Sequence, residues 1–211
     1  MSTARLIASF QTELDKRLNP EGFRREGTDH VGYWHRGEGR SLFLAFGTGI
    51  YATTIRLSPA AGVRFDAVED LFHQSSGFPE DARTDTCTVI APDRAFFRHP
   101  DGRARFIELT EGSAPEAVGQ AEAAFREALP FFERFRSLTD IDGALNGSPT
   151  ARCHYQSLEY FRCAKGLIAA KLVDRPGLSA LADAYTRRLK ADNNAFYLPR
   201  FMRLVSALLG S

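Results

Sequence analysis

The chain has 211 residues, of which 44% are hydrophobic and 25% are charged, and its formal net charge is +1. These values are typical of a globular protein and exclude an extended disordered chain. The sequence contains no apolar run of the roughly 18 residues that a membrane span needs, and its start has no apolar signal-peptide core, so we expect no membrane association and a cytoplasmic location.

The first part of the chain is predicted to form a helix followed by an antiparallel meander. Apolar residues recur at three- and four-residue spacing from Leu6 to Leu18, which is typical of an amphipathic helix, and Asn19-Pro20 ends it. A short helix is expected at 65–74. Turns are expected at Gly37–Gly39, Gly47–Gly49 and Pro100–Gly102. The predicted strands are 30–36, 40–46, 50–57, 86–91, 95–99 and 103–110.

The second part of the chain is predicted to be helical. Ser113-Ala-Pro-Glu116 matches a capping box and starts a helix that extends to residue 138, and Pro130 should kink or split this helix. Asn146–Pro149 is the best linker candidate, and further helices are expected at 155–173, 178–191 and 198–209. The predicted fold class is therefore α+β. An antiparallel sheet of five or six strands covered by helices forms domain 1–138, and an all-helical C-terminal subdomain occupies 139–211.

The residues after the first helix carry a resemblance to a known group of proteins. Gly22-Phe-Arg-Arg-Glu-Gly27 is followed by Tyr33-Trp-His-Arg36. An amphipathic helix, a turn of this glycine-phenylalanine-x-arginine type and an antiparallel meander resemble uncharacterised bacterial domains, some of which are treated as immunity proteins because they are encoded beside toxins. The resemblance covers the first half of the chain. It implies the fold and an immunity-type role, and it brings no catalytic residues.

One glycine motif formally matches a dinucleotide-binding fingerprint. Gly47-x-Gly49-x-x-Ala52 follows an apolar strand, as that fingerprint requires. A helix should follow to hold the pyrophosphate at its N-terminus, but the next residues are β-branched and favour a strand. We therefore interpret the glycines as a turn in which one of them has a positive φ, and we predict no cofactor.

The spacing of the histidines, cysteines and acidic residues indicates neither a metal site nor a catalytic site. No two of the five histidines have helical ligand spacing, and Asp140-Ile-Asp142-Gly143 is interpreted as a helix start with capping carboxylates, not as a calcium loop. Cys153 and Cys163 are expected on one helix, and all three cysteines, which include Cys87, are expected to be reduced. Glu159 and Arg162 are interpreted as a solvated ion pair. We predict no metal and no catalytic residues.

Charge is divided unevenly along the chain. Residues 151–211 carry 10 basic and 4 acidic side chains, a net charge of +6, and residues 1–150 carry the balancing −5. The two parts could neutralise each other, or the basic part could bind an anionic partner. Aromatic residues lie near the basic ones in the sequence. The predicted partner-binding residues are Arg187, Arg188, Lys190, Arg200 and Arg203.

The leading hypothesis is a non-catalytic protein that binds an acidic protein partner, such as a cognate toxin. Nucleic acid is the less favoured partner because the overall charge is near neutral and no known reader motif is present. The alternative is a small-molecule-binding protein or an enzyme with a site between the sheet and the helical half. Catalytic groups dispersed in the sequence would leave no local motif.

Overall fold

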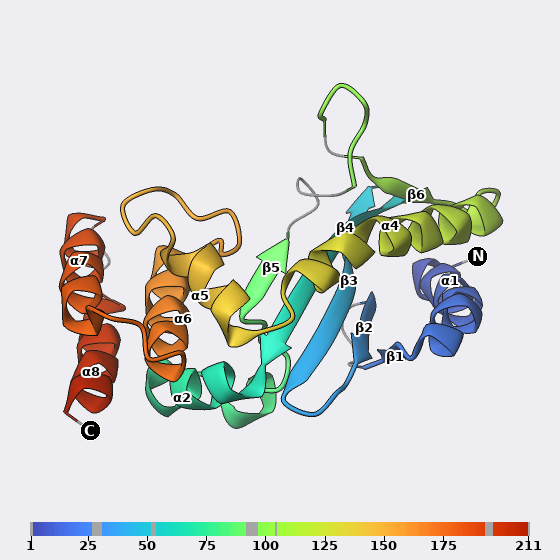
Figure 1. Cartoon of the computed structure of the whole chain (residues 1–211). Helices are drawn as coiled ribbons and strands as arrows, with labels where there is room; N and C mark the ends of the chain where they lie inside the picture. The colour runs from blue at the N-terminus through green and yellow to red at the C-terminus, as the bar shows by residue number, and fades with distance from the viewer. Residues whose placement is uncertain are drawn as a thin grey trace. The chain divides into compact units, whose positions relative to one another are not determined.

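The computed structural model describes residues 2–26, 31–51, 54–91, 97–103, 105–192 and 196–210. The chain forms two compact units, each made of two separate segments (Figure 1). Unit 1 comprises Met1–Val63 and Ala91–Glu133, and unit 2 comprises Arg64–Ile90 and Arg134–Ser211. This division differs from the expected boundary at residue 138, because unit 2 also includes residues 64–90.

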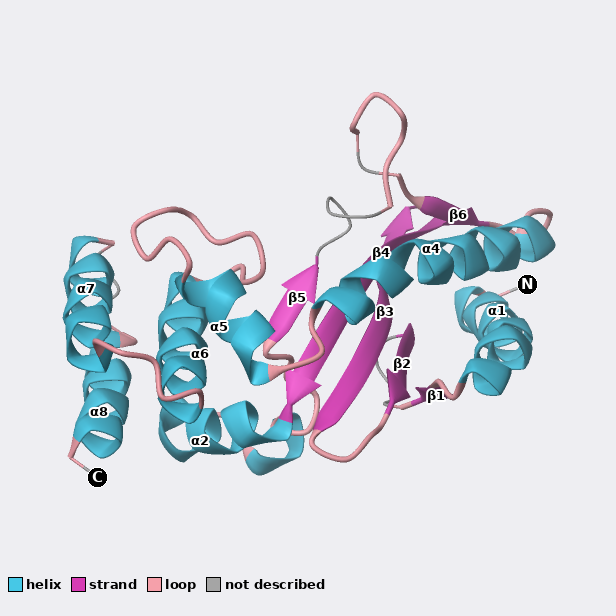
Figure 2. Cartoon of the chain, in the orientation of Figure 1, coloured by secondary structure: helices cyan, strands magenta, loops and turns pink. Residues whose placement is uncertain are grey.

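The predicted α+β class is confirmed. An antiparallel sheet with the strand order β1-β2-β3-β4-β5 is packed with helices, and β6 also pairs with β4 (Figure 2). The register places Tyr33 opposite Leu44 and Leu57 opposite Ile107. The strands are β1 Arg24–Arg25, β2 Val31–His35, β3 Arg40–Tyr51, β4 Thr54–Phe65, β5 Val89–Ala91 and β6 Ile107–Leu109.

The turn predicted at Gly47–Gly49 is wrong. β3 continues through both glycines to Tyr51, and β4 begins at Thr54, so the predicted strand 50–57 is divided between two strands. Neither glycine has the expected positive φ. The physical reason is the length of β4: its 12 residues pair with a β3 of equal length, which moves the connection beyond Tyr51. Residues 52 and 53 of that connection lie outside the described part of the chain.

Two helices of unit 1, α1 (Thr3–Leu18) and α4 (Ala114–Arg134), pack against one face of the sheet, as predicted. Phe10 of α1 meets Phe46 of β3 edge to face at 6.2 Å. The buried Tyr33 hydroxyl donates to Asp15 at 2.9 Å, and burial together with this bond raises the pKa of Tyr33. Phe23 reaches α4, where its ring lies 5.2 Å from that of Phe125.

Of the two outcomes predicted for Pro130, the split of the long helix does not occur, and the kink stays a prediction. α4 continues unbroken through Pro130 and ends at Arg134, one turn later. The next helix, α5 (Leu138–Asn146), begins with a capping box in which Ser137 and Asp140 exchange hydrogen bonds. These bonds from Ser137 lower the pKa of Asp140. The interpretation of Asp140 as a helix cap is therefore confirmed.

The hairpin turn predicted at Pro100–Gly102 is confirmed. Gly102 has a φ of +81°, a conformation that glycine adopts without steric cost. Its amide donates to the His99 carbonyl at 2.8 Å, and the His99 amide donates to Arg103 at 3.0 Å. The turn therefore fixes the position of His99 beside β6.

Unit 2 is built around one buried helix. That helix, α6 (Glu159–Leu172), packs against four others, which explains why most of its residues are buried, including the charged Arg162 and Lys165. The predicted bounds of α7 and α8 are confirmed to the residue. Within the described ranges, no helix combines the length and the apolar character needed to cross a membrane. The other helices are α2 Asp66–Ser76, α5, α7 Leu178–Ala191 and α8 Leu198–Leu209, and short 3₁₀ turns lie at Asn19–Glu21 and Glu80–Ala82.

Candidate functional site

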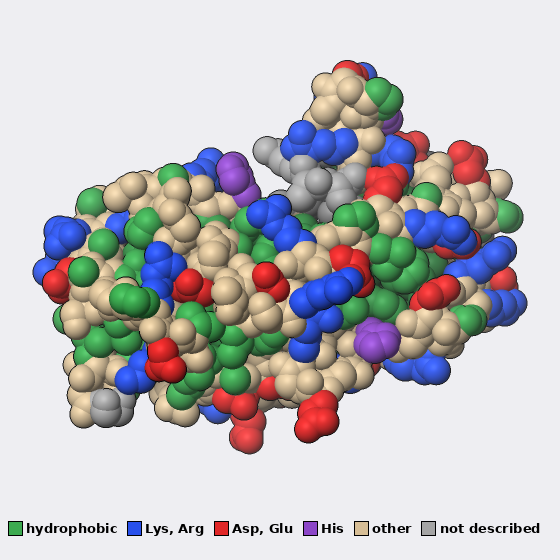
Figure 3. Space-filling view, in the orientation of Figure 1, with side chains coloured by type: hydrophobic (Ala, Val, Ile, Leu, Met, Phe, Trp, Pro, Cys, Tyr) green, Lys and Arg blue, Asp and Glu red, His purple; other side chains and the backbone are tan. Residues whose placement is uncertain are grey.

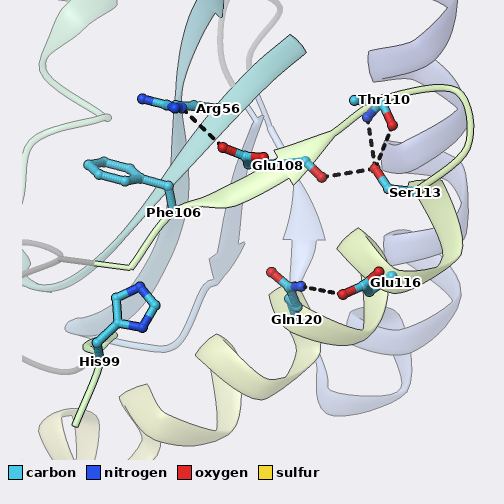
Figure 4. Close-up of a pocket in the computed structure, with 8 residues that line it drawn as sticks. All are labelled: Arg56, His99, Phe106, Glu108, Thr110, Ser113, Glu116 and Gln120. Atoms are coloured by element: carbon cyan, nitrogen blue, oxygen red, sulfur yellow. Dashed lines mark hydrogen bonds and ion pairs between the residues drawn. The ribbon is translucent and has the colours of Figure 1, made fainter. Parts of the chain in front are cut away.

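Unit 1 has an open groove of about 520 Å³ between β4, β6 and α4 (Figure 4). Arg56 of β4 and Glu108 of β6 lie on one side of it, and Glu116 and Gln120 of α4 lie on the other. The Phe106 ring and the His99 imidazole border the same space, and Thr110 and Ser113 lie at the end of β6.

Most polar groups of the groove bind one another. Arg56 pairs with Glu108 at 3.3 Å, as expected for residues directly opposite each other on β4 and β6. Ser113 accepts a hydrogen bond from the Thr110 amide at 2.9 Å and donates to the Glu108 carbonyl at 3.0 Å. The predicted capping box between Ser113 and Glu116 is therefore wrong, because the serine hydroxyl is used to close the preceding turn. Ser113 also has no base that could activate it as a nucleophile among these partners.

The predicted partner-binding residues have different environments in unit 2. Arg187, Lys190 and Arg203 are exposed, and no carboxylate of the described residues forms an ion pair with them. Arg188 differs, because its guanidinium pairs with Glu159 and donates to the Thr150 carbonyl. Its charge is thus used within the unit.

Arg200 has a third environment, in which its guanidinium lies over an aromatic ring and close to a glycine. The guanidinium carbon lies 4.5 Å from the centre of the Phe196 ring, and that ring is 68% exposed. The guanidinium is also close to Gly77, where an added Cβ would come within 2.9 Å of it. Gly77 has a φ of +74° at the end of α2, so glycine both ends that helix and leaves room for Arg200.

The aromatic residue next to Phe196 anchors this arrangement. Tyr197 stacks on the buried Tyr160 of α6, with ring centres 4.6 Å apart and planes 11° apart. Burial raises the pKa of Tyr160 to about 12, so this ring is neutral at physiological pH. Tyr197 therefore fastens the start of α8, and with it Arg200, to the core of unit 2.

Basic side chains, drawn in blue, are also visible over α7 at the edge of the molecule (Figure 3).

Unit 2 contains a buried polar cluster that sequence reasoning missed. Lys165 of α6 donates to Glu69 of α2 at 3.0 Å and to the Cys87 carbonyl at 2.6 Å. The hydroxyls of Thr86 and Thr88 donate to the two oxygens of the same carboxylate, at 2.7 and 2.9 Å. Burial disfavours the ionised carboxylate, but Lys165 and the two hydroxyls outweigh it and lower the pKa of Glu69.

His73 extends this cluster. Its Nε2 lies 2.8 Å from the Thr86 hydroxyl and its Nδ1 lies 3.0 Å from the Ser76 hydroxyl. Burial lowers the pKa of His73, and the neighbouring Lys165 adds to this effect. Since Glu69 is fully buried and every polar group in the cluster has a partner, the cluster holds α2 and α6 together and offers no surface to a substrate.

The interpretation of Glu159 and Arg162 as a solvated pair is wrong. Arg162 is buried, with its side chain 2% exposed, and pairs with Glu159 at 2.9 Å. It also donates to the carbonyls of Leu145, Ser148 and Ala151. The segment predicted as a linker, 146–149, is thus fastened to α6 by one arginine.

The three cysteines differ in position and burial. Cys153 lies before α6 begins at Glu159, so the expectation that it shares a helix with Cys163 is wrong. All three cysteines are free, as expected. Burial, and then the nearby Glu159, raise the pKa of the Cys163 thiol, which makes it a poor nucleophile. Across the residues described above, no three potential ligands are placed to hold a metal ion.

No family model, characterised protein or solved structure matches this chain.

Proposed function

We propose that the protein is a non-catalytic binding protein that recognises an acidic protein through α7, α8 and the residues just before α8. The observation that carries this proposal is the geometry of Arg200. A guanidinium placed over an aromatic ring loses less freedom on binding than a free one, and its planar donors match a carboxylate. In the described part of the chain, no carboxylate occupies that position.

Three further basic residues of α7 and α8 belong to the proposed surface. Arg203 lies one helical turn further along α8, and Arg187 and Lys190 share a face of α7 because they are three residues apart. A contact between the Thr186 hydroxyl and the Met202 sulfur, at 3.8 Å, brings the two helices together at this level. Arg188 is left out of the proposed surface because Glu159 binds it.

Phe196 gives this surface the character of a protein-binding site. Large exposed aromatic side chains beside arginine are enriched where proteins bind each other, and a nucleic-acid partner would favour a larger and more continuous basic surface. An immunity-type role, in which the partner is a cognate toxin, is the specific case that the resemblance of the N-terminal half favours. The alternative of an enzyme or a small-molecule-binding protein stays a prediction.

The test combines affinity capture with charge reversal. The wild-type protein is used to capture partners from a native lysate, beside a variant with Arg187, Lys190 and Arg203 changed to glutamate. A control variant carries the same change at the exposed Arg5, Lys16 and Arg98 of unit 1. We expect the wild type and the control variant to capture an acidic protein that the first variant does not capture. Added salt should weaken the binding of this protein.

Arg200→Lys separates geometry from charge, because it keeps the cation and removes the planar group. We expect this substitution to weaken the affinity for the captured partner about tenfold, in line with the loss of one charge-assisted hydrogen bond. Retention of every partner by the reversed variant, or recovery of nucleic acid alone, would show that the proposal is wrong.

A further inference from the structure

The groove of unit 1 has an exposed aromatic ring and an unpaired carboxylate on opposite sides. Phe106 is 41% exposed, although it directly precedes the buried β6 residue Ile107. Phe106 and Glu116 both border the groove shown in Figure 4 and its continuation of about 590 Å³ along α4, which Gly119 and Ala123 also line. The two parts thus form one surface that Phe106 and Glu116 both border.

Among the described residues that line the groove, one carboxylate has no basic partner. Arg56 is neutralised by Glu108, and Arg105 pairs with Glu127 at 2.9 Å. Glu116 accepts a hydrogen bond from the uncharged Gln120 amide at 3.1 Å, and no basic side chain of the described residues pairs with it. The carboxylate that remains without a counter-charge therefore faces the same space as the Phe106 ring.

We propose that this groove binds an arginine or lysine side chain carried by an extended segment of a partner polypeptide. The cationic end would pair with Glu116, and the Phe106 ring would contact the aliphatic stem and the cation. A polypeptide fits better than a free small molecule. Small-molecule sites bury most of their ligand, whereas Arg56, His99, Phe106, Glu108 and Glu116 are all exposed here.

A glycine in the wall of the groove supports a binding role. Gly119 lies inside α4, where glycine is less favourable than alanine by about 1 kcal/mol. A Cβ at this position would meet no atom within 4 Å, and no backbone strain calls for glycine there. Glycine at this position leaves the adjoining part of the groove without a side chain.

The same glycine provides a direct test. Gly119→Leu should fill the groove without disturbing its walls. Gly143→Leu is the matched control, because Gly143 is also helical with open space around it but lies in α5 of unit 2. Thermal unfolding of both variants will show that each is folded. Glu116→Gln removes the charge and keeps the shape of the side chain.

The probe is the blocked peptide acetyl-Ala-Ala-Arg-Ala-Ala-amide, titrated into labelled protein and followed by amide chemical shifts. We expect saturable shifts at Phe106, Gly119 and Gln120, about tenfold weaker binding for the citrulline peptide and for Glu116→Gln, and loss of the shifts in Gly119→Leu. Gly143→Leu should bind like the wild type.

Several results would overturn the proposal. They are an absence of shifts at millimolar peptide, equal binding of the citrulline peptide, or unchanged affinity in Glu116→Gln. Arginine amide that binds as tightly as the peptide would indicate a small-molecule site instead. Shifts that grow with protein concentration without peptide would indicate that a second copy of the chain occupies the groove. None of these results depends on the basic surface of unit 2.

Discussion

Replacing Lys165 with methionine should destabilise unit 2 strongly, because it leaves a buried carboxylate without its counter-charge. The ammonium bonds to Glu69 at 3.0 Å and to the Cys87 carbonyl at 2.6 Å. Methionine has a similar length and can occupy the space beside the Phe72 ring, which lies 4.7 Å from the ammonium. Loss of volume is therefore a small part of the expected effect.

The expected magnitude follows from the partners that are lost. Breaking a buried ion pair from one side costs about 3–5 kcal/mol, and the two hydroxyls that remain on Glu69 cannot replace a charge. Glu69→Gln in the same background removes the stranded charge, so the double variant should recover much of the loss. Urea unfolding of the wild type, both single variants and the double variant gives the coupling energy directly.

The outcome that would refute this reasoning is a loss below about 1 kcal/mol for Lys165→Met, since that is the size of an exposed pair. The reasoning would also be contradicted if the double variant lost more free energy of unfolding than the two single variants lose together. Arg126→Met is the matched control, because Arg126 pairs with Glu122 at 2.7 Å but its side chain is 71% exposed. It should change stability by no more than about 0.5 kcal/mol.

Two further predictions concern ionisable groups of unit 2. Because burial lowers the pKa of His73, the unfolded chain binds a proton there more readily than the folded chain, so stability present above a pH of about 6.5 is lost as the pH falls. In His73→Gln, the free energy of unfolding measured in urea should therefore fall less steeply between pH 7 and 5. An identical slope in the variant and the wild type would contradict this. Cys153 is half-buried, whereas Cys87 and Cys163 are buried, so a thiol reagent should modify one cysteine quickly in the native protein and all three in denaturant; loss of the fast phase in Cys163→Ser instead of Cys153→Ser would contradict the assignment.

Helices with clear local signals could be predicted from the sequence to the residue. α7 begins directly after Gly177, whose φ is +76°, and α8 has Pro199 in its first turn. Both signals act within a few residues and do not depend on the rest of the fold. The prediction of the β3–β4 turn was wrong for the opposite reason. The position of that turn depends on the length over which β3 pairs with β4, and the glycines at 47 and 49 do not indicate this length.

The candidate sites show the same limit. The exposed basic residues of α7 and α8 could be chosen from helical spacing, but the engagement of Arg188 by Glu159 could not, because that pair joins two helices. The cluster around Glu69 unites α2, the segment before β5 and α6. A glutamate and a lysine on separate helices look like ordinary surface residues in the sequence. Only their burial indicates otherwise.

The segmented construction of the two units has a consequence for synthesis on the ribosome. The chain leaves unit 1 at residue 63, returns at residue 91 and leaves again after residue 133. Unit 1 can therefore fold only after residue 133 has emerged, and residues 64–90 must wait longer still, because Lys165 has not yet been made. At about 5–20 residues per second, Glu69 waits several seconds for the synthesis of its counter-charge. The two segments of unit 2 can pair only after that time.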